Sequence, residues 1–376
     1  MRDVELSRVP TPSLLLDAGR VRQNAVRMGE VAHSEGVRLR PHIKTHKCVE
    51  VARIQTAGHD GGVTVSTLAE ARAFAANGFD DITYAVPIEQ GKFAEVIDII
   101  RGGVDLNVIT DDVATAGLLD AAAAEANVQI GVFLKVDCGY HRCGVEPDEP
   151  AAMAIPRAIS DATNLDLVGI LTHAGHSYHA RTKEELLATA RQERDVMVEF
   201  SERLRCDGIE VPTVSIGSTP TMSAIDHLDG IDEIRPGNYI FFDAFQATLG
   251  SCGFDDCALT VLTAVTHVSQ QHRKIIVDAG GIALSKDRGA VEFDAGCGYG
   301  RVLDLEGSDL GLRVGSLSQE HGEILVEDDT IFDTILVGSR LRILANHSCL
   351  TAAQHTHYNV LDDGEIVDRW KIHSGW

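Results

Sequence analysis

The sequence predicts an α/β protein in which a (β/α)8 barrel of the TIM type is followed by an antiparallel β domain. Three observations carry this prediction. Apolar runs rich in β-branched residues alternate with helical patterns along the first two thirds of the chain, and such alternation is typical of a parallel sheet. The runs number eight over roughly 230 residues, which suits a closed barrel. After Asp243 strand-like runs follow one another directly, which predicts a second domain.

Length and composition set the outer limits of the interpretation. The chain has 376 residues, of which 44% are hydrophobic and 24% are charged, as in ordinary globular proteins with room for two domains. This composition excludes a disordered chain, a fibrous repeat and a small disulfide scaffold. No apolar run approaches the roughly 18 residues of a membrane-spanning helix. The start of the chain, MRDVELSR, lacks the apolar core of a secretory signal, so we expect a cytoplasmic protein.

The charge balance narrows the class of partner. Lys and Arg total 33 against 56 Asp and Glu, a formal net charge of −23. This excess argues against binding to nucleic acid or to an anionic membrane surface, and an anionic substrate would need a local cluster of positive charge. The eight cysteines are scattered without a CxxC spacing, which indicates reduced thiols in a reducing compartment.

Eight apolar runs are predicted as the barrel strands. They are Val37–Arg40, Gly62–Ser66, Ile82–Val86, Asp105–Ile109, Gln129–Asp137, Leu165–Thr172, Val211–Ile216 and Glu233–Arg235. A doubly wound open sheet is the structural alternative. The glycine-rich stretch Gly296–Gly300 does not lie between a strand and a helix, so we interpret it as a loop and not as a dinucleotide-binding fingerprint.

Helical patterns separate most of these runs. Gln23–Ser34 has an apolar face and a possible N-cap at Asp17. Thr67–Asn77 begins with Ser66 and Thr67 and has Glu70 close behind, which resembles a capping box. Three more helices are predicted at Phe93–Ile100, Asp112–Ala126 and Lys183–Leu204.

The remainder of the chain is predicted as β structure. Strand-like runs occur at Leu259–Val268, Arg273–Asp278, Leu312–Leu317, Glu323–Val326, Arg340–Asn346, Tyr358–Leu361 and Glu365–Ile372. Asp362-Asp363-Gly364 is a hairpin turn signal between the last two. Pro12–Asp17 is a spare strand that could join this domain. We therefore expect a barrel over residues 18–245 and a β domain over residues 246–376 together with residues 1–17.

Polar and titratable residues follow the ends of the predicted strands, where barrels build their active sites. Lys44 follows the first strand, Arg142 the fifth, and the turn Gly217–Thr219 the seventh. Each alone is ordinary, since a lysine at a strand end is usually a surface residue. Together they suit pyridoxal phosphate: a lysine forms an imine with the aldehyde, N–H groups and hydroxyls hold the phosphate, and an arginine tunes the ring.

With these residues in place, the sequence resembles the fold-type III pyridoxal-phosphate enzymes, which are alanine-racemase-like barrels. Within them it resembles the D-serine dehydratase and D-threonine aldolase family, which includes 3-hydroxyaspartate dehydratases and aldolases. The motifs that carry the resemblance are PHIKTHK (41–47), Asp137–Gly144, LTHAG (171–175), VSIGSTP (214–220), RPGNYIFFD (235–243), QEHG (319–322) and NHSC (346–349). The resemblance also implies a homodimer.

The resemblance implies a role for each residue of the cofactor site. Lys44 would be the catalytic Schiff-base lysine, Arg142 would contact the ring hydroxyl, and His173 and Tyr178 would line the ring. Arg235 occupies the position that meets the ring nitrogen in alanine racemases. The residues implied to hold the phosphate are Ser215, Gly217, Ser218, Thr219, Gly237, Asn238 and Tyr239.

His347-Ser348-Cys349 is a candidate metal site. On a strand, residues two apart point to the same face, so an imidazole and a thiolate would project together. A soft thiolate beside an imidazole favours zinc, with manganese, cobalt or magnesium as other divalent candidates. The ordinary alternative is a buried cysteine beside a polar histidine. The resemblance implies a zinc site here in the dehydratases, whereas aldolase members tend to carry Asp in place of this cysteine.

The resulting hypothesis is a metal-dependent elimination of water from a D-3-hydroxy amino acid, such as D-serine, D-threonine or D-threo-3-hydroxyaspartate, to give a 2-oxo acid and ammonia. The D configuration comes from the resemblance, and the sequence does not select the β-substituent. The alternative is a retro-aldol cleavage to glycine and an aldehyde. Only Cys349 distinguishes between the two reactions. A racemase lacks a clear second base in this tail. A non-catalytic pyridoxal-phosphate carrier would be a single barrel without the β tail.

Overall fold

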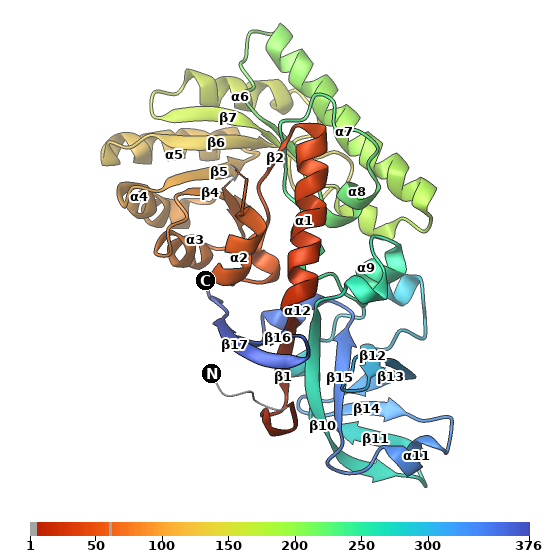
Figure 1. The fold of residues 1–376 in the computed structure, drawn as a ribbon. Coiled ribbons are helices and arrows are strands. Elements are labelled where there is room, and N and C mark those ends of the chain that lie inside the picture. The colour runs from red at the N-terminus through yellow and green to blue at the C-terminus, as the bar shows by residue number, and fades with distance from the viewer. Residues whose placement is uncertain (1–5, 60–61) are drawn as a thin grey trace. The chain divides into compact units, whose positions relative to one another are not determined.

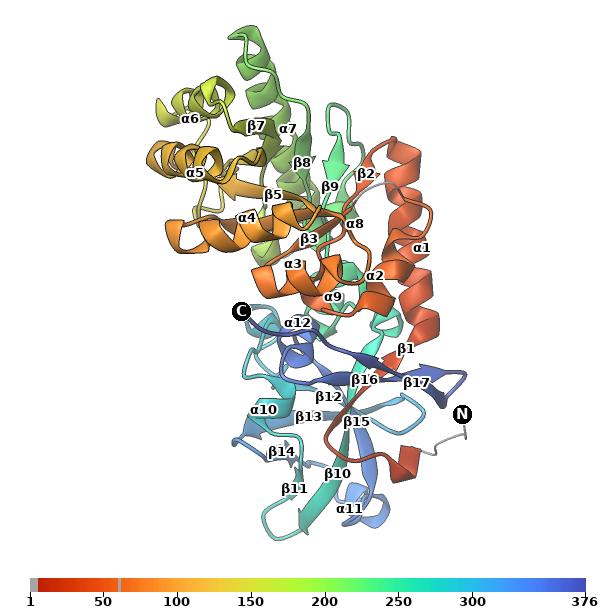
Figure 2. The ribbon, with the colours of Figure 1, turned by 90° about the vertical axis from the view of Figure 1, so that its left-hand side faces the viewer.

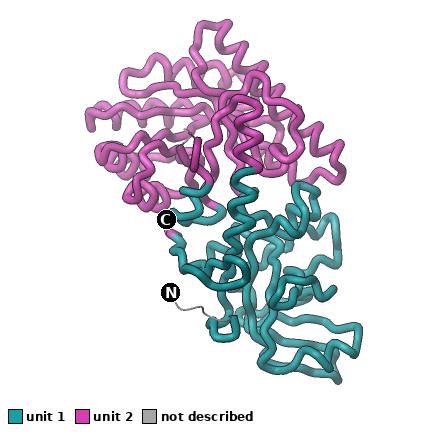
Figure 3. The backbone as a smooth tube through the Cα atoms, in the orientation of Figure 1, with its two compact units in different colours: residues 1–26, 45–54, 238–372 teal, residues 27–44, 55–237, 373–376 magenta. Residues whose placement is uncertain are grey.

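The fold was described from a computed structural model that covers residues 6–59 and 62–376 (Figure 1). The first five residues of the predicted segment 1–17 lie outside the described residues. Contacts divide the chain into two compact units (Figure 3). The barrel unit comprises residues 27–44, 55–237 and 373–376, and the β unit comprises residues 1–26, 45–54 and 238–372. The predicted boundary between residues 245 and 246 stays a prediction.

The barrel unit is built on eight parallel strands. These are β2 (Arg38–Leu39), β3 (Val63–Val65), β4 (Asp81–Pro87), β5 (Asp105–Thr110), β6 (Ile130–Lys135), β7 (Leu165–Leu171), β8 (Val214–Ile216) and β9 (Glu233–Ile234). They lie in the order β2-β9-β8-β7-β6-β5-β4-β3. A parallel bridge between His42 and Thr64 links the β2 and β3 ends of this sheet. All eight predicted strands are therefore present, and the barrel prediction is confirmed.

Helices lie between successive strands, as the alternating pattern requires (Figure 1). They are α1 (Ala18–Glu35), α2 (Val49–Thr56), α3 (Leu68–Ala75), α4 (Phe93–Arg101), α5 (Val113–Ala126), α6 (Ala151–Asp161), α7 (Lys183–Cys206) and α8 (Thr219–Ala224). The predicted caps are correct: Asp17 Oδ1 accepts from the N–H of Arg20 at 2.9 Å, and Thr67 Oγ1 accepts from Glu70 at 3.1 Å. The prediction missed α2, α6 and α8, since α6 contains Pro156 and the other two are short.

The β unit is a nine-stranded sheet that is antiparallel except at one pair (Figure 2). Its strands are β1 (Ser13–Asp17), β10 (Leu259–Ser269), β11 (Lys274–Val277), β12 (Gly300–Leu303), β13 (Asp309–Leu317), β14 (Gly322–Leu325), β15 (Arg340–Ala345), β16 (His357–Asp362) and β17 (Glu365–Lys371). The order is β11-β14-β13-β12-β15-β10-β1-β16-β17, and an additional β10–β11 pairing closes the first six into a ring.

The N-terminal strand joins this sheet as predicted. β1 pairs antiparallel with β10 and parallel with β16. The loop prediction for Gly296–Gly300 is correct for residues 296–299, and β12, a strand that was not predicted, begins at Gly300. The sheet carries two small helices that matter for the site, α9 (Ala244–Leu249) and α10 (Gly281–Leu284), and a third, α12 (Ser348–Ala352), that follows β15 directly.

Candidate active site

Lys44 lies where the prediction places it, just after the first barrel strand. It sits in a 3₁₀ turn, Ile43–Thr45, and its side chain is exposed. The backbone that leads to it is held firmly, because the N–H of His42 donates to the carbonyl of Pro236 at 3.0 Å and His42 bridges to Thr64. The ammonium group is thus presented from a fixed backbone at the end of the barrel where the strands terminate.

Four cationic side chains of the barrel unit lie near His173. Burial lowers its pKa well below the usual value, and four nearby cations lower it further: Lys44, Arg142, Lys135 and Arg235. His173 packs edge-on against the Tyr140 ring at 6.0 Å between centroids, and the Arg142 guanidinium lies 5.3 Å from the same ring. A cluster of cations around a neutral imidazole suits a ligand with anionic groups, and pyridoxal phosphate has both a phosphate and a phenolic oxygen.

Arg235 is fully embedded in the barrel. Its Nε donates to Ser215 Oγ at 2.8 Å, and its terminal nitrogen donates to the carbonyl of Thr172. Ser215 in turn donates to Glu233 Oε1 at 2.7 Å. Burial lowers the pKa of Arg235 to about 10. The side chain of Ser215 is therefore committed to this chain of hydrogen bonds, and its predicted contact with a phosphate stays a prediction.

The predicted phosphate turn is highly ordered. Ser218 caps α8, with its hydroxyl accepting from the N–H of Thr221 at 3.3 Å and lying 3.1 Å from Ser177 Oγ. Gly217 has a φ of +106°, a conformation that favours glycine. The N–H of Gly217 donates to Glu193 Oε1 at 3.2 Å. Gly217, Ser218 and Thr219 are all buried together at this turn, and a phosphate would share or replace these acceptors.

Glu193 and Lys135 are residues that the sequence analysis missed. Glu193 is fully buried on α7, and its Oε1 accepts from the N–H groups of both Ala174 and Gly217, at 3.0 and 3.2 Å. Lys135 is the last residue of β6 and is 4% exposed. Lys135 lies before the predicted Arg142 loop, and Glu193 lies in a helical pattern with many charged residues. The sequence therefore contains no sign that either belongs to the site.

The remaining predicted cofactor residues lie in three places. Tyr178 is half-buried in the 3₁₀ turn Gly175–His179, five residues after His173. Gly237 ends the segment 55–237 of the barrel unit, and Asn238 and Tyr239 begin the segment 238–372 of the β unit. All three are buried. The Asn238 side chain is turned toward the metal pair, so a phosphate contact by Asn238 would come from its main chain.

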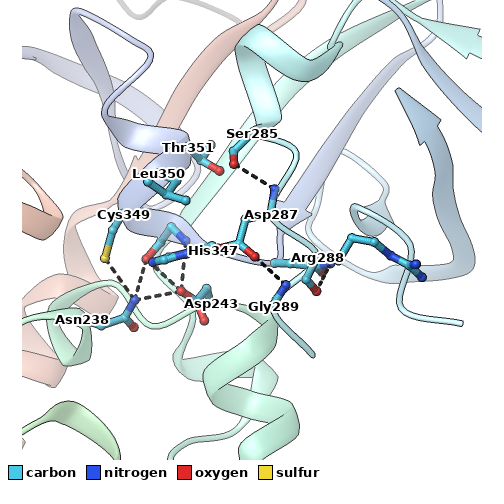
Figure 4. A network of polar contacts seen from close by, with 12 residues as sticks. Asn238, Asp243, Ser285, Asp287, Arg288, Gly289, His347, Cys349, Leu350 and Thr351 are labelled. Carbon is cyan, nitrogen blue, oxygen red and sulfur yellow. Dashed lines mark hydrogen bonds and ion pairs between the residues drawn. The ribbon is translucent and has the colours of Figure 1, made fainter. Parts of the chain in front are cut away.

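The metal pair lies within the β unit, where the structure corrects one step of the prediction. β15 ends at Ala345, His347 is the N-cap of α12, and Cys349 lies in the first turn of that helix. The two residues therefore do not alternate along a strand. The strand-to-helix turn nevertheless keeps them near each other, and the His347 ring lowers the pKa of the Cys349 thiol. Figure 4 shows the pair beside Asn238, Asp243 and Asp287.

Polar groups surround the Cys349 sulfur. Thr45 Oγ1 lies 3.3 Å from Sγ, and Asn238 Nδ2 donates to it at 3.4 Å. Burial raises the pKa of the Cys349 thiol, but hydrogen bonds from His347 and Thr45 outweigh burial, and the net pKa is below the usual value. Asp243 orients the amide, since its Oδ2 accepts from Asn238 Nδ2 at 2.8 Å and from the Ser348 N–H at 2.9 Å.

His347 has a carboxylate partner that the sequence analysis missed. Its Nδ1 lies 2.6 Å from Asp287 Oδ2. Burial lowers the pKa of His347, but the bonds to Asp287 and Cys349 outweigh it and leave the pKa well above the usual value. The same contact lowers the pKa of Asp287. The shifts favour the thiolate form of Cys349 and the protonated form of His347, and a divalent metal would bind the pair by displacing the protons.

The donor set fits a metal with open coordination positions. Within residues 6–59 and 62–376, no cluster of three or more His, Cys, Asp or Glu side chains is arranged to bind an ion. His347 and Cys349 supply one nitrogen and one sulfur donor, which is the chemistry that zinc prefers. In the same described residues, no helix is long and apolar enough to cross a membrane.

Comparison with known proteins defines the class. Residues 16–244 match the family described as "Alanine racemase, N-terminal domain", and residues 258–361 match "Putative serine dehydratase domain". These matches, together with the relatives below, place the chain among fold-type III pyridoxal-phosphate enzymes. It belongs to the family of D-serine dehydratases and D-threonine aldolases.

Three relatives illustrate the similarity. The D-threo-3-hydroxyaspartate dehydratase of Delftia sp. (strain HT23) is 40% identical over 100% of both chains, and its solved structure gives a TM-score of 0.96 over 99% of this chain and 100% of that one. The D-serine dehydratase of Dictyostelium discoideum is 34% identical over 99% and 98% of the two chains. A solved D-threonine aldolase from Filomicrobium marinum is 28% identical with a TM-score of 0.85, over 99% and 97%.

Two solved variants of D-threo-3-hydroxyaspartate dehydratase bear on the metal pair. In one a histidine is replaced by alanine, and in the other a cysteine is replaced and the protein is described as the metal-free form. Those two positions are two residues apart in that chain, as His347 and Cys349 are here.

Proposed function

We propose that the protein is a lyase that uses pyridoxal phosphate and zinc to eliminate water from a D-3-hydroxy amino acid, giving a 2-oxo acid and ammonia. The observation that carries the proposal is the proximity of His347 and Cys349 at the start of α12, since a thiolate ligand distinguishes the expected dehydratase site from the aldolase site. The relatives at 40% and 34% identity are named dehydratases, whereas two curated aldolases are 30% and 28% identical. We also propose a cytoplasmic homodimer.

Pyridoxal phosphate, when bound, supplies an electron sink for the pair of electrons left at the substrate Cα. In this proposal the Nζ of Lys44 would hold the cofactor and would also act as the base that removes the α-proton of the substrate. Arg142 and Arg235 would bring positive charge near the ring, while His173 stays neutral because burial and the surrounding cations depress its pKa. A neutral His173 can accept or donate a hydrogen bond without adding to the positive charge.

The metal, when bound, supplies a Lewis acid for the β-hydroxyl, which leaves poorly on its own. His347 Nε2 and Cys349 Sγ would hold the ion, and the hydrogen bonds from Thr45 and Asn238 would fix the sulfur. A soft thiolate favours zinc over manganese, cobalt or magnesium. In the aldolase alternative, the same hydroxyl would keep its electrons and the Cα–Cβ bond would break.

The test is product analysis with D-serine, D-threonine and D-threo-3-hydroxyaspartate. We expect ammonia and a 2-oxo acid in a one-to-one ratio, with activity lost after chelation and restored by zinc. Glycine with an aldehyde as the main products would establish the aldolase and contradict the Cys349 argument. Full activity in the metal-free protein would remove the metal from the reaction.

Two further experiments, one labelling and one variant, locate the chemistry. Borohydride reduction should attach the cofactor to the peptide that contains Lys44, and a label on any other lysine would refute that assignment. Cys349→Asp should retain the cofactor and shift the metal preference toward manganese, because a carboxylate is a harder ligand than a thiolate. An unchanged preference for zinc in Cys349→Asp would show that the sulfur does not bind the metal.

A further inference from the structure

Asp287 divides its two carboxylate oxygens between its own loop and the His347 ring. Oδ1 accepts from the N–H of Gly289 at 2.8 Å, which closes a tight turn just after α10. Oδ2 lies 2.6 Å from His347 Nδ1. One oxygen therefore anchors the side chain while the other is free to orient the imidazole (Figure 4).

The Asp287 loop is attached to the metal-pair segment at further points. The amide of Asn346, the residue before His347, donates to the carbonyl of Arg288 at 2.9 Å. Thr351 Oγ1, beyond Cys349, donates to the carbonyl of Leu284 at 2.8 Å. Within the loop, the N–H of Asp287 donates to Ser285 Oγ at 3.1 Å, and Ser285 has a φ of +70°. The loop that carries the Asp287 carboxylate is thus attached to the chain both before His347 and after Cys349.

A carboxylate at this distance selects one tautomer of the imidazole. When Asp287 accepts from Nδ1–H, the lone pair of His347 lies on Nε2, which is then the only ring atom that can bind a cation. The negative charge of Asp287 also makes the imidazole nitrogen a stronger electron-pair donor to a metal ion. Carboxylate partners of this kind change metal affinity by about 10- to 100-fold when they are removed.

We propose that Asp287 is a positioning residue of the metal site, which fixes the ring orientation and the tautomer of His347 so that Nε2 faces the ion. The inference rests on the proposed function, because it requires that His347 binds a metal. The competing explanation is structural: the carboxylate would only tie its loop to the end of β15. The two explanations differ in what they predict for metal affinity at constant fold.

Asp294 provides a matched control. Its Oδ1 accepts from the N–H of Gly296 at 2.8 Å, which is the same aspartate–glycine turn that Asp287 makes with Gly289. Asp294→Ala therefore removes an equivalent loop contact while leaving the imidazole partner in place. Asp287→Ala removes both contacts, and Asp287→Asn keeps the shape and one acceptor oxygen but loses the charge.

The experiment measures zinc affinity by competition with a chromophoric chelator, in protein loaded with pyridoxal phosphate. We expect Asp287→Ala to bind zinc about 10- to 100-fold more weakly than the wild type, Asp287→Asn to lie between them, and Asp294→Ala to match the wild type. The cofactor absorbance should be the same in all four proteins, since Asp287 acts on the metal ligand. Thermal unfolding midpoints report whether each variant is folded.

The outcomes separate the two proposals. Wild-type zinc affinity in both Asp287 variants overturns the positioning role and leaves the metal site intact. Equal weakening in Asp287→Ala and Asp294→Ala shows that loop structure alone is responsible, and also overturns it. A wild-type protein that binds neither zinc, manganese nor cobalt overturns the metal site of the proposed function, and the role of Asp287 with it. If Asp287→Ala does not fold, Asp287→Asn decides.

Discussion

At the scale of single residues, Lys135 stands out because a lysine is rarely buried without an ionic partner. It lies at the end of β6, is 4% exposed, and donates to the carbonyl of Val136 at 3.0 Å. Burial lowers its pKa to about 8 from an ordinary value of 10.5, and the neighbouring Arg235 and Arg142 lower it as well. Among the described residues Lys135 has no carboxylate partner, so burial of its ammonium group destabilises the folded state.

We predict that Lys135→Met stabilises the cofactor-free protein at pH 7. The folded pKa lies below the unfolded one, so the folded state binds fewer protons between about pH 8 and 10.5, and the stability of the wild type rises with pH across that window. Below it the penalty is constant, at up to about 3 kcal/mol. Urea unfolding at pH 7 and pH 10 measures it: the difference between variant and wild type should shrink at pH 10. A difference that grows would contradict the argument.

Single residues also show what the sequence could and could not reveal about the site. Lys44, His347 and Cys349 became candidates because each stands in a short motif that carries the family resemblance; a lysine after a strand, or a histidine and a cysteine two positions apart, would not suffice alone, and their roles stay predictions. Asp287 was not identifiable, since it lies 60 positions from His347 in a loop with no distinguishing pattern. Contacts between residues that are far apart in the sequence form only when the chain folds, and a single sequence does not indicate which residues will meet.

At the scale of elements, α7 connects two barrel loops through one carboxylate. Glu193 Oε1 accepts N–H bonds from Ala174 in the loop after β7 and from Gly217 in the loop after β8. These loops carry His173 and the predicted phosphate turn. A buried helix side chain thus holds two segments that must keep a fixed spacing if they are to bind one ligand.

We predict that Glu193→Ala weakens pyridoxal-phosphate affinity by at least tenfold. Two hydrogen bonds to a charged group are lost, and each contributes about 1.5–3 kcal/mol, so both loops gain freedom that ligand binding must remove. Glu193→Gln keeps an acceptor and should lose less. The control is Glu185→Ala on the same helix, whose carboxylate accepts from the N–H of Arg181 at an exposed end. Cofactor titration measures the effect, and unchanged affinity in Glu193→Ala would refute the clamp.

The β17 hairpin was predictable because its signal is local. Asp363 and Gly364 both have positive φ, at +49° and +83°, as a two-residue turn of type I′ requires. The short helix α12 was not predictable, because only Asn346 and His347 separate it from β15 and the prediction extended the strand. Turn residues can be identified from the sequence, because their preference is local. The residue at which a strand ends and a helix begins depends on packing.

We predict opposite effects for the same substitution at two glycines. Gly364→Ala should destabilise by about 1–2 kcal/mol, because an L side chain is strained at positive φ. Gly117→Ala, in the middle of α5, should stabilise by up to about 1 kcal/mol through helix propensity. An added Cβ meets nothing within 4 Å at either position, so backbone conformation alone decides. Urea midpoints measure both, and shifts of the same sign would contradict the turn assignment.

At the scale of the whole molecule, the net charge of −23 creates self-repulsion that the fold must withstand. Long-range repulsion among surface carboxylates is screened by salt, with a Debye length of about 10 Å at 0.1 M. The positive cluster around His173 is local and opposes this field. The acidic surface and the cationic barrel end thus have separate origins, one in bulk composition and one in the placement of a few residues.

We predict that potassium chloride raises the thermal midpoint of the holoenzyme at pH 7.5, by a few degrees between about 0.02 and 0.5 M, where surface charges become screened. The increase should largely disappear near pH 5, because the sequence pI is about 5.0 and little net charge then remains to be screened. The comparison between the two pH values is the control for general effects of the salt on apolar burial, which do not depend on net charge. Differential scanning calorimetry at matched cofactor and zinc concentrations makes the measurement.

An equal increase at both pH values would show that screening of the net charge is not the cause. A decrease at pH 7.5 would show that favourable ion pairs, such as Arg191 with Asp226, outweigh the repulsion.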